Sequence, residues 1–134
     1  MFTQIKTSAK NREVVGNLTR KFNLGAENII ARIAIAYSLK SGVRFSPTNV
    51  RDSGGKEYTK NVLFGNYYFI YLALMCTHYG ISANNKDLPR YFKMHLDDGL
   101  DRIAKDLKDN PNLTGYDYLL DNISEGIDEI CSTK

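Results

Sequence analysis

The sequence has few of the features that identify secreted, disordered or membrane proteins. Its 134 residues contain two cysteines, three prolines and no tryptophan. Cys76 and Cys131 cannot make the framework of bridges that stabilises small secreted domains, and no apolar run reaches the roughly 18 residues of a membrane span. The first residues, MFTQIKTSAKNR, lack the charged, apolar and small-residue order of a signal peptide. We therefore expect a cytoplasmic protein whose two thiols stay reduced.

The sequence also lacks the common motifs of metal and phosphate chemistry. Cys76 and His78 lie two residues apart within an expected helix, where they point in different directions and do not share a metal. The Gly-Gly-Lys stretch at 54–56 differs from a phosphate-binding loop, because Val50 stands where that loop needs glycine and Glu57 where it needs Ser or Thr. We expect no metal and no cofactor.

One cluster of acidic residues leaves an enzyme as an alternative. Asp97, Asp98 and Asp101 are close neighbours on an expected helix rather than convergent carboxylates, so a solvated face is the simpler interpretation. His95 precedes Asp98 by three residues, and this pair could serve a nicking nuclease. The pattern is sparse, and we predict that the protein is not an enzyme.

Hydrophobic periodicity predicts a mainly α protein, a single compact helical domain of about five helices over residues 1–134. The expected helices cover 9–22, 27–40, a third that begins within 61–67 and ends before Gly80, 87–108, and a fifth after Thr114 that buries Leu120, Ile123, Ile127 and Ile130. Ser8, Asp87 and Thr114 are the expected N-caps. Residues 2–7 could form a short strand, and 43–60 a basic loop or small hairpin.

The second expected helix, within ENIIARIAIAYSLKSG at 27–42, is apolar on almost every side. A helix of this kind is buried all round. A chain of five helices can surround about one of them completely. We therefore predict an oligomer whose interface includes Ile29, Arg32, Ile33 and Tyr37. There Arg32 would pair with a carboxylate or a helix C-terminus. The alternative is that Arg32 reaches the edge of its own domain.

The charges are unevenly divided along the chain. Residues 1–60 hold 11 Lys and Arg against 4 Asp and Glu, whereas residues 61–134 hold 7 against 11. A basic first half predicts a polyanionic partner on one side of the protein. Chance scatter of solvated charges is the alternative.

The first expected helix concentrates this positive charge. Lys10, Arg20 and Lys21 share a face with Glu13 and Asn17, opposite the apolar positions. Cations at this spacing suit DNA phosphates, which position a duplex without reading its sequence. The predicted DNA-binding residues are Lys6, Lys10, Arg12, Arg20 and Lys21.

A strand followed by two helices also resembles the ribbon-helix-helix regulators. Those proteins dimerise through a two-stranded ribbon that enters the major groove, and Gln4 and Lys6 would be the reading side chains here. Domains of that kind need only the first 42 residues or so, and they leave 43–134 unexplained. A transcriptional regulator of this class is the second hypothesis.

A closer resemblance covers nearly the whole chain. The stretches NIIARIAIAYSL at 28–39, GKEYTKNVLFGNYYFIYLALMCTHYG at 55–80 and DLPRYFKMHLDDGLDRI at 87–103 resemble the DndE family of bacterial DNA sulfur-modification (phosphorothioation) proteins. The resemblance implies a non-catalytic helical homotetramer that binds duplex DNA with a preference for nicked duplex. It also implies partners that carry the chemistry: a cysteine desulfurase, an adenylating sulfur-transfer enzyme and an ATPase. Lys6, Lys10 and Lys21 match the family's DNA-binding lysines in placement, and Arg12 and Arg20 are added for their chemistry.

Overall fold

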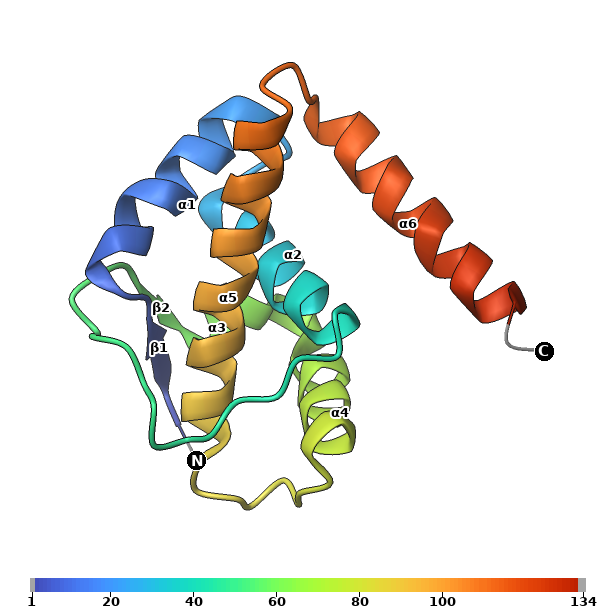
Figure 1. Cartoon of the computed structure of the whole chain (residues 1–134). Coiled ribbons are helices and arrows are strands. Elements are labelled where there is room, and N and C mark those ends of the chain that lie inside the picture. The colour runs from blue at the N-terminus through green and yellow to red at the C-terminus, as the bar shows by residue number, and fades with distance from the viewer. Residues whose placement is uncertain (1, 133–134) are drawn as a thin grey trace.

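The computed structural model describes residues 2–132, and it is mainly helical (Figure 1). Its elements in chain order are β1 (Gln4–Lys6), α1 (Ala9–Phe22), α2 (Glu27–Lys40), β2 (Glu57–Thr59), α3 (Lys60–Phe64), the 3-10 turn η1 (Gly65–Tyr67), α4 (Tyr68–Tyr79), α5 (Leu88–Asp109) and α6 (Gly115–Ser132). Five helices of twelve residues or more and a short strand at the front confirm the predicted fold class. Among residues 2–132 no helix combines the length and apolarity that crossing a membrane requires.

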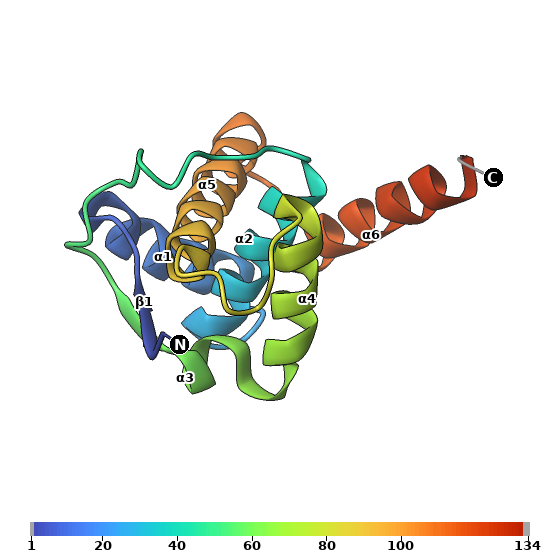
Figure 2. The same cartoon turned by 90° about the horizontal axis from the view of Figure 1, so that it is seen from below.

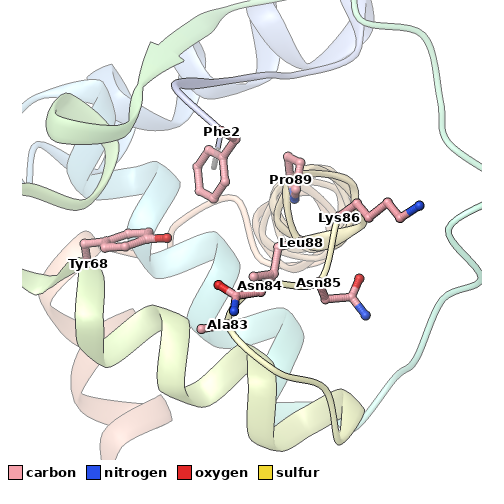
Figure 3. A pocket seen from close by; sticks show the side chains of 8 residues that line it. All are labelled: Phe2, Tyr68, Ala83, Asn84, Asn85, Lys86, Leu88 and Pro89. Carbon is pink, nitrogen blue, oxygen red and sulfur yellow. The ribbon is translucent and has the colours of Figure 1, made fainter.

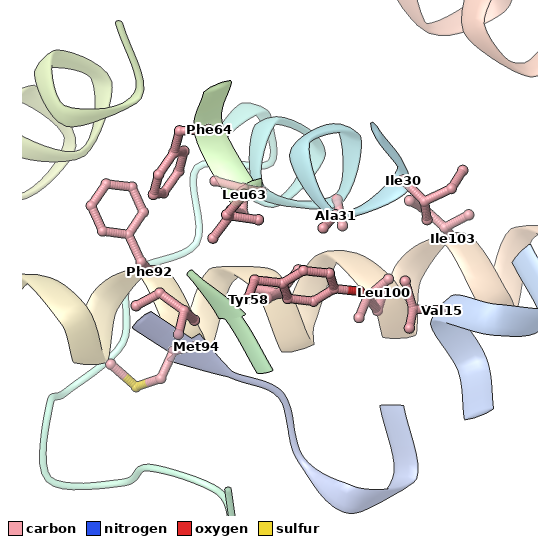
Figure 4. Packing of buried hydrophobic residues seen from close by; sticks show 14 of the residues in the cluster. Val15, Ile30, Ala31, Tyr58, Leu63, Phe64, Phe92, Met94, Leu100 and Ile103 are labelled. Atoms are coloured by element: carbon pink, nitrogen blue, oxygen red, sulfur yellow. The ribbon is translucent and has the colours of Figure 1, made fainter. Parts of the chain in front are cut away.

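The central element is α5, in which eleven of 22 residues are buried. Its main partner is α2, whose buried side chains lie along α5 in Figure 4. At Gly99 a Cβ atom would lie 1.8 Å from the carbonyl oxygen of Ala34, so the two helix backbones touch directly. In both Figure 1 and Figure 2, α1 and α4 lie on opposite sides of α2.

The two strands form a short antiparallel pair within the chain. Ile5 of β1 is opposite Tyr58 of β2, and both side chains are buried, whereas Gln4 and Lys6 face solvent. A ribbon-helix-helix protein pairs this strand with the same strand of a second copy. Here β2 takes that position, which removes the main structural reason for the regulator hypothesis.

The helix predicted to be buried on every side, α2, is buried on only one. Ile30, Ala34 and Ile35 are fully covered, whereas Ile29 and Ile33 are half-buried and Ala36 is exposed. These partly open sides are the ones that the predicted oligomer would cover with other subunits, so the burial of α2 on every side stays a prediction. The most buried helix is α5, in spite of its charges.

Arg32 has its partners within its own chain. Its Nε donates to the carbonyl oxygen of Leu63 at 2.6 Å, and an Nη donates to that of Val62 at 3.3 Å. These carbonyls lie in the last turn of α3, where helix carbonyls lack partners of their own. The guanidinium also lies 5.8 Å from the centre of the Tyr67 ring. The expected pairing with a helix C-terminus is therefore present, but it holds α2 to α3 in the same subunit.

The third predicted helix is interrupted at Gly65. This residue ends α3 with φ +55, and the helix resumes as α4 after the 3-10 turn. This positive φ favours glycine, and a Cβ atom at this position would lie 2.8 Å from the Arg32 guanidinium, which would have to shift.

Two of the three predicted N-caps do not form. The side chains of Ser8 and Asp87 make no capping hydrogen bond, whereas Thr114 Oγ1 accepts from the Asp117 amide at 3.2 Å. At the start of α1 a distant residue replaces the expected cap, because Asp52 accepts from the Ala9 amide at 2.8 Å.

The last helix, α6, leaves the body of the protein instead of completing its core (Figure 1). It is attached near its start, where Tyr118 stacks on Phe22 with ring centres 5.3 Å apart. The four residues predicted to be buried are each more than half exposed: Leu120, Ile123, Ile127 and Ile130. Amphipathic spacing identified the helix but did not show how much of its apolar side stays exposed.

Candidate nucleic-acid interface

The outer face of α1 is the most basic helical surface of the protein. Its inner face is fixed against the core by the buried side chains of Asn11, Val15, Leu18 and Phe22. The periodicity of the helix then directs the remaining side chains outward. Glu13 is the only carboxylate of the helix. Its four exposed cations are Lys10, Arg12, Arg20 and Lys21.

These four cations have no acidic partner in the part of the chain that the structure describes, a property that Arg44, Lys86 and Lys108 share outside this helix. Elsewhere Lys6 pairs with Glu57, Lys40 with Glu125, Arg51 with Asp101 and Lys56 with Glu27, at 2.6–3.9 Å. Within residues 2–132, no carboxylate forms an ion pair with any cation of α1. Their positive charge is therefore not neutralised locally and is available to an external anion.

The predicted binding residues fall into three groups. Lys10 and Lys21 lie on the same side of α1, and Arg20 is next to them with its guanidinium donating to Asn17 Oδ1. Arg12 lies on the other flank, where its Nη donates to the Gly55 carbonyl at 2.9 Å. Lys6 lies on β1 beside Glu57, so its charge is partly neutralised.

The beginning of α1 is fixed by a buried ion pair that sequence reasoning missed. Lys93 Nζ donates to Asp97 Oδ2 at 3.1 Å and to the carbonyls of Lys6 and Asp52 at 2.9 and 2.8 Å. Asp97 Oδ1 accepts from Asn11 Nδ2 at 2.7 Å and from the Ser8 amide at 3.0 Å. Charges buried in this way must be paired, and their partners join α5 to the start of α1.

The prediction that Asp97 belongs to a solvated acidic patch was therefore wrong. Asp97 is 1% exposed, whereas Asp98 and Asp101 lie nearer the surface and pair with Arg102 and Arg51. The signal that could have identified the buried pair is the i,i+4 spacing of Lys93 and Asp97 inside the otherwise apolar run around YFKMHL.

The possible catalytic pair of His95 and Asp98 is not formed. Ser38 lies between them, since its hydroxyl donates to Asp98 Oδ2 at 2.7 Å and contacts His95 Nδ1 at 2.8 Å. Because this hydroxyl proton is used on Asp98, Nδ1 is the donor to Ser38, and Nε2 accepts from the Tyr79 hydroxyl at 2.6 Å. Both ring nitrogens thus have partners inside the fold. Burial lowers the pKa of His95 to about 4, which keeps the ring neutral near pH 7.

A surface pocket at the start of α5 offers little further chemistry. It has a volume of about 340 Å³, and Phe2, Tyr68, Lys86 and Pro89 are among its lining residues (Figure 3). No histidine, cysteine or carboxylate lines it. Over residues 2–132, no three His, Cys, Asp or Glu side chains are grouped to hold a metal. The basic face of α1 is therefore the strongest candidate for a functional site.

Comparison with known proteins identifies the family of this chain and solved structures of the same fold. The model of the family described as "DNA sulphur modification protein DndE" matches residues 4–110. One similar solved structure is that of "DndE from Escherichia coli B7A involved in DNA phosphorothioation modification", with a TM-score of 0.62 and 20% identity over 77% of this chain and 98% of the other. The "DndE G21/24K mutant involved in DNA phosphorothioation" has a TM-score of 0.65 and 21% identity over the same shares. A comparison with curated protein sequences gave no match.

Proposed function

Because this chain belongs to the DndE family of DNA sulphur modification proteins, we propose that it is the DNA-binding subunit of a phosphorothioation system. It binds duplex DNA through the outer face of α1, with a preference for nicked duplex, and it works in the cytoplasm. The observation that carries this proposal is the set of exposed α1 cations without acidic partners within residues 2–132: Lys10, Arg12, Arg20 and Lys21.

The physical argument is electrostatic. Each lysine or arginine that approaches a phosphate releases a condensed counterion, and this release drives binding without regard to sequence. A cation that already pairs with a carboxylate gains less, since it exchanges one anion for another. Lys10 and Lys21 should therefore contribute most, Arg12 and Arg20 less because of their existing hydrogen bonds, and Lys6 least.

We place the chemistry of sulfur transfer on partner proteins. A cysteine desulfurase, an adenylating sulfur-transfer enzyme and an ATPase would carry it, and this subunit would hold the DNA without catalysing a step. The burial of His95 supports this assignment, because a general acid or base must reach its substrate, and this ring is fully covered and bonded to Ser38 and Tyr79 inside the fold.

The protein is proposed to act as a homotetramer. Apolar surface remains beside α2, where Ile33, Ala36 and Tyr37 line a hollow of about 240 Å³ together with side chains of α4 and α6. Contiguous exposed apolar surface of this kind marks an interaction site. Assembly would also bring several α1 faces to one DNA molecule, which raises affinity without new contacts.

The test is fluorescence anisotropy with one labelled duplex, intact and with a single nick, and with a second duplex of unrelated sequence. The variant Lys10→Gln/Lys21→Gln should weaken binding to all three alike, and the native chain should bind the nicked duplex more tightly than the intact one. The matched control is Lys86→Gln/Lys105→Gln, which removes the same charge outside α1. Equal affinities of the two double variants would refute the α1 interface.

A further inference from the structure

A surface hollow lies between β1, the loop 41–56 and the first turn of α5. Its volume is about 420 Å³, which is within the size range of sites for small ligands. Three cations and two neutral polar side chains are among its lining residues: Lys6, Arg90, Lys93, Gln4 and Ser53. Of the residues that the structure describes, no carboxylate lines it. We refer to it as the β1 hollow.

The walls of the β1 hollow are held together by the buried side chain of Lys93. From α5 its Nζ donates to the carbonyl of Lys6 in β1 at 2.9 Å and to that of Asp52 in the loop at 2.8 Å. Its charge is neutralised by Asp97. Three segments that are distant in the sequence are thus fixed around one hollow. A site that is already formed loses less conformational freedom when it binds a ligand.

Arg90 supplies the positive charge that remains free in the β1 hollow. One Nη donates to the Pro47 carbonyl at 3.3 Å, and no carboxylate within residues 2–132 forms an ion pair with this side chain. A guanidinium has five N–H donors, so a single hydrogen bond leaves most of them for a ligand. Their planar arrangement matches two oxygens of a phosphate group.

The carboxylates beside the hollow are already engaged. Asp52 accepts from two backbone amides, one at the start of α1 and one in its own loop. Glu57 pairs with Lys6 at 3.5 Å, and an exposed pair of this kind is weak enough to exchange for another anion. The hollow therefore suits an anion that is held mainly by Arg90, with Lys6 at its edge.

The β1 hollow adjoins the basic face of α1. Lys6 lies four residues before Lys10, so their Cα atoms are at most about 14 Å apart. The wall formed by the loop is joined to the first turn of α1, where the Ala9 amide donates to Asp52 (Figure 1). A DNA molecule bound on the outer face of α1 would therefore have phosphates close to the hollow.

We propose that the β1 hollow binds the terminal phosphate of a DNA strand end, with Arg90 as its main cation and Ser53 and Gln4 as hydrogen-bond donors. An internal phosphate continues into the strand on both sides, and three walls obstruct it, whereas a strand end can enter with its phosphate first. A terminal phosphate also carries more negative charge than an internal one, about −1.5 to −2 at pH 7. The inference rests on the proposed function and gives the preference for nicked duplex a chemical cause.

Fluorescence anisotropy tests this site with duplexes whose ends are closed by hairpin loops. The nick is prepared in three forms: with a 5′-phosphate, with a 3′-phosphate, and with hydroxyl groups on both sides. The native chain should bind a phosphorylated nick about tenfold more tightly than the hydroxyl nick, and Arg90→Gln should bind all three alike. The matched control is Arg44→Gln, which removes another exposed arginine outside the hollow and should keep the preference.

The outcomes separate this inference from the proposal on which it rests. A native chain that binds all three nicks equally would overturn the inference and leave DNA binding by α1 in place. A phosphate preference that Arg90→Gln retains would show that another site recognises the strand end, and would also overturn it. A native chain that binds no duplex at low salt would overturn both proposals.

Nuclear magnetic resonance of the native chain with a 5′-mononucleotide tests the hollow without DNA. The titration should shift the amide signals of Lys6, Ser53 and Arg90, and inorganic phosphate should shift the same signals, whereas the nucleoside without its phosphate should not. No shift, or shifts confined to α1, would contradict the site. Shifts at the hollow together with equal affinities for the three nicks would assign it to a free phosphate compound and overturn its role at strand ends.

Discussion

Lys93 and Asp97 form an ion pair inside the protein, on successive turns of α5, with Nζ and Oδ2 3.1 Å apart. Their remaining hydrogen-bonding groups are used by Lys6, Asp52, Asn11 and Ser8. The pair thereby fixes β1, the loop before β2 and the first turn of α1 to one helix. It holds α1 in place while the opposite face of that helix presents its cations.

Replacing Lys93 should destabilise the fold strongly. Lys93→Met leaves the Asp97 carboxylate buried without its cation, and we expect the free energy of unfolding in urea to fall by about 3 kcal/mol. The control is Lys105→Met, which removes the same i,i+4 pairing with an exposed aspartate, Asp109. That change should cost far less, because an exposed ion pair contributes little to stability. Similar losses in the two variants would show that the buried pair is not an anchor.

The contact between α2 and α5 should tolerate no side chain at Gly99. A Cβ atom there would lie 1.8 Å from the Ala34 carbonyl oxygen, so Gly99→Ala must push the two helices apart. We expect a loss of about 3 kcal/mol or more in urea unfolding. Gly126→Ala on α6 meets no atom within 4 Å and should not reduce stability, because alanine favours the helix. A Gly99→Ala protein as stable as the native one would contradict the packing.

His95 should make stability depend on pH. Its pKa is about 4 in the folded protein and about 6.5 in an unfolded chain. Between these values the unfolded chain binds more protons, so the free energy of unfolding falls as the pH drops from about 6.5 to about 4. The full contribution is on the order of 3 kcal/mol. Urea unfolding at a series of pH values measures it.

His95→Asn is the matched variant for this measurement. It should be less stable at pH 7 because hydrogen bonds to Ser38 or Tyr79 are lost, yet its stability should decline less between pH 6.5 and 4. Asp52, whose pKa is lowered by hydrogen bonds from the Ala9 and Gly54 amides, adds the same loss at lower pH to both proteins. Parallel pH profiles would show that His95 does not titrate as described.

Periodicity predicted the helices well and their environments less well. The bounds of α1 and α2 agree with the sequence because a turn that contains glycine follows each helix, at Gly25 and at Gly42. The position of α6 was also predicted, but its Ile and Leu side chains, which were expected to be buried, are exposed. A repeat shows that a helix has an apolar side, and it does not show whether the same chain supplies the partner.

Only part of the candidate site could be predicted from the sequence. The cations of α1 lie on a face that helical geometry determines from the sequence alone. Their lack of acidic partners depends on contacts between distant residues, such as Lys6 with Glu57 or Arg51 with Asp101. The buried role of Asp97 also depends on distant partners, since Ser8 and Asn11 reach it from α1 across more than 80 residues of sequence.

The most direct test of the central claim is the salt dependence of DNA binding by the native chain and by Lys10→Gln/Lys21→Gln. The slope of log affinity against log salt measures the phosphates neutralised, at about 0.9 per contact. The account predicts a steep slope for the native chain and a slope shallower by about 2 for the variant, in proportion to the number of copies that contact the DNA. Equal slopes for the two proteins would mean that the outer face of α1 does not contact DNA.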